Sequence, residues 1–230
     1  MREQRTENRE RKSRGLVFVI SGPSGSGKTT LAAALVQDKQ LAPRLAKSIS
    51  VTTRPKRTGE REDEDYFFLS REEFLQQRRA KKILEWTRYL GYYYGTPREF
   101  VEKKLAQGKS MVLSLDSRGV SQLRKLYPGD IRTIFVVPPS LAELEQRITR
   151  RSAKVAPGEI KKRLRLARRE LSLADRYEYR IVNTKFTQAL KDLKKIVAKE
   201  LRLVKRGLPR QNLLQGRQFK KLNLKGWCSR

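Results

Sequence analysis

The sequence contains no histidine, and Cys228 is its only cysteine among 230 residues. Without histidine, imidazole acid–base catalysis and His-ligated metal sites are excluded, and one cysteine can form neither an internal disulfide nor a Cys-rich zinc site. The sequence also lacks any apolar run near the roughly 18 residues that a membrane-spanning helix needs. We therefore expect neither an integral membrane protein nor a disulfide-stabilised secreted one.

Acidic residues are scarce as well. The chain has 24 Asp and Glu against 54 Lys and Arg, so its formal net charge is +30. Residues 1–14 have a net charge of +3 and residues 202–230 one of +9, which leaves +18 on residues 15–201. This excess suits a polyanionic ligand such as nucleotide phosphates or nucleic acid. A general solubility bias is the alternative interpretation, above all for the two ends.

The composition divides the chain into three expected parts. They are a basic, flexible N-terminal arm at residues 1–14, a folded domain at residues 15–204 and a basic tail at residues 205–230. The arm has no apolar stretch like that of a signal peptide, and its glutamates distinguish it from a transit peptide. Together with the lone cysteine, this predicts a cytoplasmic protein that does not associate with membranes.

The central part alternates short β-branched runs with helical patterns, which is typical of an α/β fold with a mostly parallel central sheet flanked by helices. Strands are predicted at residues 16–20, 110–115, 132–137 and 179–182. A helix rich in Ala and Leu is predicted over residues 29–36, and apolar residues recur at helical spacing over residues 160–171 and 190–201.

Three further helix starts have the Ser/Thr-x-x-Glu spacing of a capping box, in which a side chain at each end satisfies a backbone N–H of the other. These starts are Ser70 with Glu73, Thr96 with Glu99, and Ser140 with Glu143. Pro97 suits the first helical position after Thr96, and Gly108 predicts the end of that helix.

Residues 22–29, Gly-Pro-Ser-Gly-Ser-Gly-Lys-Thr, match the P-loop pattern G-x-x-x-x-G-K-[ST]. The glycines let backbone N–H groups converge on phosphate oxygens, and the following helix directs its positive end at the same anion. Lys28 is predicted to bridge the β- and γ-phosphates, and the Thr29 hydroxyl to ligate Mg²⁺. Since the motif lies between a predicted strand and a predicted helix, we interpret it as a nucleoside triphosphate site. The predicted ATP-binding residues are Gly22, Pro23, Ser24, Gly25, Ser26, Gly27, Lys28, Thr29 and Thr30.

More motifs follow in order along the chain. They are SISVTTRPKRTGE at residues 48–60, DYFF at residues 65–68, EW at residues 85–86 and GYYYGT at residues 91–96. With the P-loop, they resemble the guanylate kinase family, ATP:GMP phosphotransferases with the P-loop nucleoside monophosphate kinase fold. The resemblance covers about residues 16–201. It implies a small GMP-binding subdomain at about residues 50–100, a lid at about residues 147–163, and Mg²⁺ with ATP as the phosphoryl donor. The implied acceptors are GMP and dGMP, in purine nucleotide metabolism.

The residue types in these motifs suit a guanine monophosphate. Guanidinium forks and phenol hydroxyls bind phosphate dianions, and a carboxylate can accept from both N1–H and the amino group of guanine. The resemblance implies that the phosphate is bound by Arg54, Arg57, Tyr66 and Tyr94. It likewise implies that the guanine is bound by Ser50, Glu85, Thr96 and Asp116. Taken singly, each motif could be a solvated loop or an aromatic strand, but their joint order favours a GMP site.

An acceptor phosphate is already ionised near neutral pH, so phosphoryl transfer needs positioning and charge neutralisation more than a general base. The predicted catalytic residues are Lys28, Arg147, Arg151 and Arg163. Residues 152–158 would form the mobile part of the lid, although helices so rich in arginine are also often simply solvated. Asn183 matches a family position near the ATP base.

Three departures from the family keep other functions open. Ser114 stands where the family usually has the first Asp of Asp-x-Asp, which removes a carboxylate that could orient Mg²⁺ through water. Tyr92 replaces an Asn, and residues 152–158 lack an acidic run. The alternatives are a non-catalytic guanylate-kinase-like module that recognises phosphopeptides, which the intact P-loop opposes, and a kinase with an altered acceptor, which Glu85 and Asp116 oppose. Nucleic acid or another polyanion could also bind the basic tails.

Overall fold

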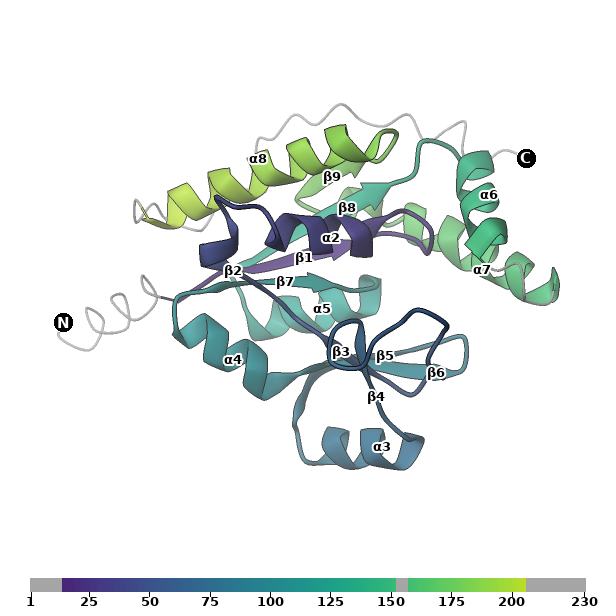
Figure 1. Ribbon diagram of the computed structural model, residues 1–230, viewed down its shortest axis with the longest axis horizontal. Coiled ribbons are helices and arrows are strands. Elements are labelled where there is room, and N and C mark those ends of the chain that lie inside the picture. The colour runs from purple at the N-terminus through teal and green to yellow at the C-terminus, as the bar shows by residue number, and fades with distance from the viewer. Residues whose placement is uncertain (1–13, 152–156, 206–230) are drawn as a thin grey trace.

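The computed structural model describes residues 14–151 and 157–205, and within them two β-sheets organise the chain (Figure 1). The larger sheet has five strands in the order β2-β7-β1-β8-β9, and the smaller has four in the order β4-β3-β6-β5. All strand pairs of the larger sheet are parallel. The strands of the small sheet lie between β2 and β7 in the sequence, so the small sheet is an insertion into the larger fold.

The larger sheet consists of β1 (Val17–Ser21), β2 (Leu45–Lys47), β7 (Ser110–Ser114), β8 (Ile131–Val137) and β9 (Tyr179–Val182). The small sheet consists of β3 (Ser50–Thr52), β4 (Tyr66–Phe68), β5 (Ile83–Tyr89) and β6 (Tyr92–Pro97). The described helices are α2 (Lys28–Val36), α3 (Arg71–Arg79), α4 (Arg98–Ala106), α5 (Ser117–Leu126), α6 (Leu141–Arg151), α7 (Pro157–Leu171) and α8 (Phe186–Lys205), with short 3₁₀ turns at Ala42–Arg44 and Ala174–Arg176.

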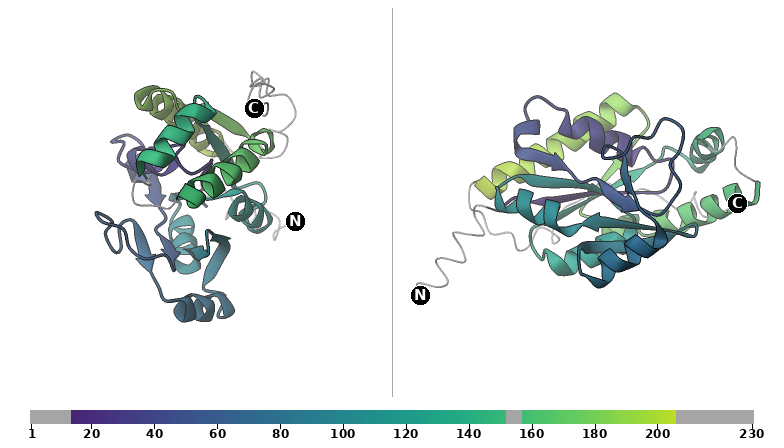
Figure 2. Two further views of the ribbon diagram at one scale, coloured as in Figure 1. Left: turned by 90° about the vertical axis from the view of Figure 1, so that its right-hand side faces the viewer. Right: turned by 60° about the horizontal axis from the view of Figure 1, so that its bottom comes forward.

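The surroundings of the central strand β1 explain why its residues Val17–Ile20 are all apolar. Val17 and Val19 pack into one hydrophobic cluster with residues of α4, α5, α6 and α7, whereas Phe18 and Ile20 pack into a second cluster with α2 and α8. Helices therefore cover both faces of the larger sheet, as Figures 1 and 2 show. A parallel strand buried on both sides has no solvent-facing positions, so alternation of polar residues disappears.

The expected fold class is confirmed, and so are the four predicted strands, each with boundaries within one residue of the prediction. The capping box at Ser70 is present: the Ser70 hydroxyl accepts from the Glu73 N–H at 3.1 Å, and the Glu73 carboxylate accepts from the Ser70 N–H at 2.7 Å. Gly108 follows the end of α4 with a φ of 75°, a left-handed conformation that favours glycine.

The helix start predicted at Thr96 is wrong. Thr96 is fully buried within β6, and its hydroxyl donates to the Glu85 carboxylate at 2.6 Å. The helix begins two residues later at Arg98, with Pro97 as its N-cap. The Thr96 side chain cannot cap a helix because it already serves the neighbouring strand.

The expected lid segment also needs correction at one end. Pro157 and Gly158 belong to the first turn of α7, so the segment between α6 and α7 is shorter than residues 152–158. Residues 152–156 lie outside the described residues, as do residues 1–13 and 206–230, which contain nearly all of the predicted arm and tail.

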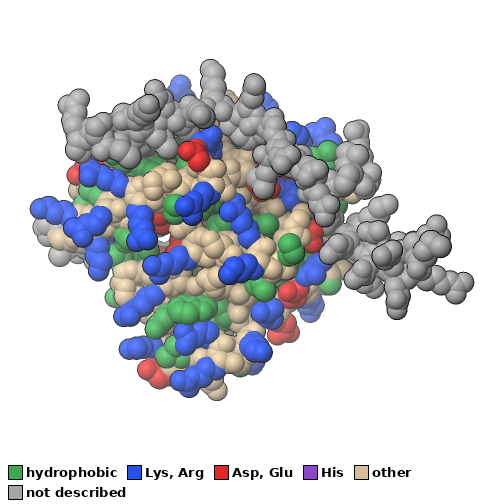
Figure 3. Space-filling model, turned by 180° about the vertical axis from the view of Figure 1, so that it is seen from behind, with side chains coloured by type: hydrophobic (Ala, Val, Ile, Leu, Met, Phe, Trp, Pro, Cys, Tyr) green, Lys and Arg blue, Asp and Glu red, His purple; other side chains and the backbone are tan. Residues whose placement is uncertain are grey.

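The surface of the described part is strongly basic. Lys and Arg side chains greatly outnumber Asp and Glu on the face seen in Figure 3. Among the helices of residues 14–151 and 157–205, none is both long and apolar enough to cross a membrane.

Candidate functional site

A cleft opens between the P-loop, the small sheet and α7, and it gathers most of the residues predicted from the sequence. It lies beyond the carboxyl ends of β1 and β7, where ligands usually bind in parallel α/β sheets. The cleft is lined by Ser24, Gly25, Gly27, Lys28, Thr29, Thr30, Lys47, Ser48, Ser50, Arg54, Arg57, Asp65, Tyr66, Glu85, Thr87, Tyr89, Tyr94, Gly95, Ser114, Leu115, Asp116, Arg163 and Glu170.

The three glycines Gly22, Gly25 and Gly27 of the P-loop have positive φ angles, and at two of them a Cβ would also collide with neighbouring atoms. Gly22 has a φ of 143°, and a Cβ there would lie 2.4 Å from the carbonyl oxygen of Val136. Gly27 has a φ of 90° as the N-cap of α2, and a Cβ there would lie 2.4 Å from the Nδ2 atom of Asn183. Gly22, Pro23 and Ser26 are buried behind the cleft, while the remaining P-loop residues line it. The loop thus presents its backbone and the Lys28 side chain at the start of a helix, as phosphate binding requires.

Asn183 and Arg147 support this loop from behind. The Asn183 side chain is buried and donates to the Ser26 carbonyl at 2.8 Å. The Arg147 guanidinium is bound to Glu143 at 2.9 Å and donates to the Asn183 carbonyl at 3.3 Å, and its Cβ lies next to Gly25. Both residues are therefore at the donor end of the site. The contact of Asn183 with the ATP base stays a prediction.

Of the other two predicted lid arginines, Arg163 lies in α7, is buried and lines the cleft. Arg151 is the last residue of α6, and its side chain is outside what the structure describes.

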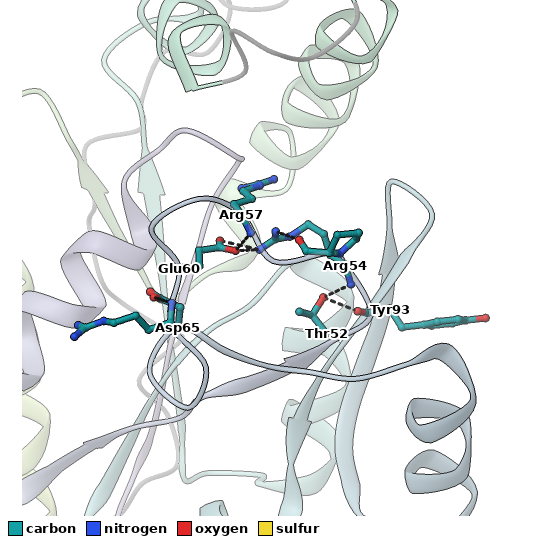
Figure 4. A network of polar contacts seen from close by, with 8 residues as sticks. Thr52, Arg54, Arg57, Glu60, Asp65 and Tyr93 are labelled. Carbon is teal, nitrogen blue, oxygen red and sulfur yellow. Dashed lines mark hydrogen bonds and ion pairs between the residues drawn. The ribbon is translucent and has the colours of Figure 1, made fainter.

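Two of the predicted phosphate-binding residues, Arg54 and Arg57, lie beside Glu60, which forms an ion pair with Arg54 (Figure 4). The guanidinium of Arg54 is only 8% exposed and contacts both carboxylate oxygens of Glu60, at 2.8 and 2.9 Å. The same carboxylate accepts from the Arg57 N–H at 2.9 Å. The Tyr66 ring lies 5.4 Å from the Arg54 guanidinium carbon and meets the Tyr94 ring edge-on. Glu60, for which the sequence predicted no role, therefore holds the loop that carries both arginines.

The predicted guanine-binding carboxylates lie at the other end of the cleft. Glu85 is 2% exposed, and its Oε1 accepts from the Thr96 hydroxyl. Burial raises the pKa of Glu85 to about 7; the nearby Asp116 raises it too, and the Thr96 hydrogen bond opposes the shift. Asp116 caps α5 by accepting from the N–H groups of Arg118 and Gly119, at 3.0 and 2.9 Å. Thr96 does not line the cleft itself, so its direct contact with guanine stays a prediction.

The sequence reasoning missed two residues beside these carboxylates. Thr87 donates to Asp116 Oδ2 at 2.8 Å and lines the cleft. A Cβ at Gly119 would lie 2.5 Å from Glu85 Oε2, so glycine leaves the room that this carboxylate occupies. Neither Thr87 nor Gly119 belongs to a recognisable sequence motif, because the role of each depends on how α5 packs against β5.

Two further cleft residues, Tyr89 and Glu170, were also missed. Burial raises the pKa of Glu170 to about 7, Lys28 lowers it and Asp116 raises it. Glu170 lies seven residues after Arg163 and three after the buried Ala167, so all three share one face of α7. The sequence did contain a signal for Glu170, because Arg163 and Glu170 fall on the same helical face as the apolar Ala167.

The donor groups in the cleft fit Mg²⁺ bound mainly through nucleotide phosphates. Thr29 is exposed in the first turn of α2, and the buried hydroxyl oxygen of Ser114 lines the cleft without a hydrogen-bond partner. The described residues contain no group of three or more Cys, Asp and Glu that could cage a metal. Mg²⁺ keeps several waters and takes only one or two protein ligands at such sites, so hydroxyls and nearby carboxylates suffice.

Comparisons with known proteins identify relatives over nearly the whole described chain. A family model described as guanylate kinase matches residues 14–200. The chain is 45% identical over 195 residues to a guanylate kinase of Synechococcus sp. (strain JA-3-3Ab), which covers 85% of this chain and 88% of that protein. It is 42% identical over 190 residues to a guanylate kinase of Bacillus anthracis, covering 83% and 91%. The crystal structure of guanylate kinase from Anaplasma phagocytophilum matches with a TM-score of 0.67 at 33% identity, covering 82% and 87%.

Proposed function

The chain belongs to the guanylate kinase family, and we propose that the cleft described above is where it phosphorylates GMP. It is an ATP-dependent phosphotransferase that converts GMP to GDP. The observation that supports this location is that the P-loop and the Glu85–Asp116 pair line one continuous cleft. ATP bound at the P-loop and GMP bound with its guanine at Glu85 and Asp116 would bring their phosphates together between these two sites.

At the donor end, the P-loop N–H groups and the start of α2 hold the ATP phosphates. Lys28 neutralises charge on the β- and γ-phosphates, and Thr29 is the protein ligand of Mg²⁺. When bound, Mg²⁺ would neutralise negative charge on β- and γ-phosphate oxygens, next to the P–O bond that breaks. Asn183 keeps the loop in shape through its hydrogen bond to Ser26, and the family resemblance assigns it a further contact with the ATP base.

At the acceptor end, Arg54, Arg57, Tyr66 and Tyr94 bind the GMP phosphate. The buried Arg54–Glu60 pair holds one guanidinium in place before GMP arrives, so little ordering is left to be done on binding. The phosphate then shares Arg54 with Glu60, since a guanidinium has five N–H donors.

The guanine is recognised by its hydrogen-bond donors. Ionised Glu85 accepts from N1–H and the amino group, with Asp116, Ser50 and Thr96 completing the contacts. Adenine presents no such pair of donors, so a bound AMP would leave buried carboxylate oxygens unsatisfied. No proposed guanine contact reaches the ribose 2′ position, so we expect dGMP to be accepted as well.

Transfer itself requires alignment and charge neutralisation, and arginines of the lid at about residues 147–163 complete both. Arg163 lines the cleft, Arg147 braces the P-loop, and Arg151 ends the helix that leads into the lid. Cytoplasmic localisation and the binding of nucleic acid by the basic arm and tail stay predictions.

The test is ADP formation from MgATP with GMP, dGMP, AMP, CMP and UMP as acceptors. We expect turnover with GMP and dGMP alone, and Lys28→Ala should lower the rate by orders of magnitude while the protein stays folded. Turnover with AMP, CMP or UMP would favour an altered acceptor. Nucleotide binding without any turnover would mean that the changes at Ser114 and in the lid have removed catalysis.

A further inference from the structure

Lys47 is a cation in the cleft to which the sequence motifs assign no role. It is the last residue of β2, the edge strand of the larger sheet, and it lines the cleft at the carboxyl end of that strand. It pairs with Val112 of β7, so it shares a face of the sheet with Ser114, two residues further along β7. Leu45 and Val112 on this face pack into one cluster with α2. Lys47 therefore lies on the side of the sheet from which the P-loop helix starts.

The amino group of Lys47 reaches the acceptor side of the cleft. Its Nζ atom donates to the carbonyl oxygen of Glu64 at 3.3 Å, in the loop that precedes β4. Tyr66, two residues later, lines the cleft, and its ring lies 5.4 Å from the guanidinium carbon of Arg54. Tyr66 and Arg54 are both proposed to bind the GMP phosphate. The lysine thus extends from the α2 side of the larger sheet to the edge of the proposed phosphate site.

No carboxylate neutralises the charge of Lys47 within residues 14–151 and 157–205, where its amino group bonds only to the neutral Glu64 carbonyl. Arg54, by contrast, already forms an ion pair with Glu60. An aspartate at position 114 would place a carboxylate on the same face as Lys47, but Ser114 offers only a hydroxyl. A phosphate oxygen is a stronger acceptor for an ammonium group than a carbonyl, because both partners are charged. A phosphate dianion in the cleft would therefore draw the amino group away from Glu64.

We propose that Lys47 is a further binding residue for the phosphate of GMP, on the side of that phosphate that faces α2. In the unliganded protein its amino group rests on the Glu64 carbonyl, and when GMP binds it moves to the phosphate. A cation at this place lowers the repulsion between the acceptor phosphate and the ATP phosphates at the start of α2. The proposal rests on the proposed function, because it takes GMP as the acceptor.

The test compares GMP with guanosine, which lacks the phosphate, by calorimetry on the full chain without ATP or metal. Lys47→Met keeps an unbranched side chain and removes the charge. It should weaken GMP binding about tenfold, as expected for the loss of one hydrogen bond to a charged group, and leave guanosine binding nearly unchanged. Lys47→Arg should retain most of the GMP affinity. The difference between the wild type and Lys47→Met should shrink as salt is raised, since salt screens this partly exposed charge.

Lys56→Met is the matched control for net charge, because Lys56 is exposed between Arg54 and Arg57 and does not line the cleft. Its GMP affinity should stay close to that of the wild type. Lys47→Gln separates phosphate binding from the contact with Glu64, because its amide can donate to a carbonyl but carries no charge. It should bind GMP as weakly as Lys47→Met does. Unfolding midpoints establish that all variants are folded.

Unchanged GMP affinity in Lys47→Met would overturn the proposal. An equal loss in Lys56→Met would also overturn it, by assigning the effect to net charge. Wild-type affinity in Lys47→Gln, or an equal loss of guanosine binding in Lys47→Met, would make Lys47 a structural tether of the loop instead. Failure of the proposed function looks different, because neither GMP nor guanosine would then bind the wild type.

Discussion

At the scale of single residues, the protonation state of Glu85 decides whether the cleft can bind guanine. Its pKa is about 7, well above the 4.5 of an ordinary glutamate, because it is buried beside Asp116. Protonated Glu85 is tolerated at low pH, whereas charging it as pH rises from about 4.5 through 7 costs the unliganded protein stability. Guanine recognition needs the opposite state, the carboxylate.

We therefore predict that guanosine affinity falls as pH drops from 8 to 6. The chain has no histidine, so no imidazole contributes in this range. Guanosine is the right probe because the phosphate of GMP itself titrates near pH 6. Affinity is measured by calorimetry across this range, with Glu85→Gln as control. That variant should bind more weakly at pH 8, by about 1–3 kcal/mol, and lose most of the pH dependence. The same slope in Glu85→Gln would place the titrating group elsewhere.

At the scale of elements, the guanine end depends on how closely α5 packs against β5. Gly119 lies in the first turn of α5, and a methyl group there would overlap Glu85 Oε2 at 2.5 Å and approach Leu115 at 3.3 Å. Alanine is the better helix former by about 1 kcal/mol, so the helix itself does not suffer from the change. The carboxylate, by contrast, has to move.

We predict that Gly119→Ala weakens GMP binding at least about tenfold, the cost of losing one charge-assisted hydrogen bond. ATP binding should stay nearly unchanged because a methyl group at Gly119 would meet Glu85 and Leu115 and no residue of the P-loop. Both affinities are measured by calorimetry, with the exposed Ser121→Ala in the same helix as control. Unchanged GMP binding in Gly119→Ala would show that Glu85 can shift without loss and is not a fixed guanine ligand.

The elements differ in how well the sequence predicted them, because some strands are very short and others, such as the seven-residue β5, mix apolar and polar residues without regular alternation. The larger sheet was predictable because strands such as β1 and β8 are five and seven residues long and buried on both faces, which leaves a continuous apolar run. In the small sheet, β3 and β4 have three residues each, too few to show a period of two. Its existence followed only from the family resemblance.

The functional residues also differ in how well the sequence predicted them. The P-loop and the Arg54–Glu60 loop were found because their functional residues are contiguous in the sequence, and the cleft is lined by most of the P-loop and by Arg54 and Arg57. Thr87, Gly119 and Glu170 were not found. Each acts through a partner distant in sequence, so its role appears only when the strands and helices have packed.

At the scale of the whole molecule, the positive charge is far larger than the cleft needs. Every residue that lines the cleft lies between positions 24 and 170, while deleting residues 205–230 would remove eight basic residues and no acidic one, lowering the formal charge from +30 to +22. The field of the remaining charge still attracts anionic nucleotides, and salt screens such long-range attraction. The catalytic groups and the excess charge are therefore separable.

We predict that deleting residues 205–230 leaves kcat for GMP within about twofold of the full chain, because no cleft residue is lost. Affinity for single-stranded RNA should fall, and in the full chain it should decrease steeply with salt, since phosphate contacts release counterions. Steady-state kinetics and RNA titrations between about 50 and 200 mM salt measure the two effects. A folded deletion variant without activity would make the tail part of the enzyme. RNA affinity that ignores salt, or that survives the deletion unchanged, would remove the tail from any role in polyanion binding.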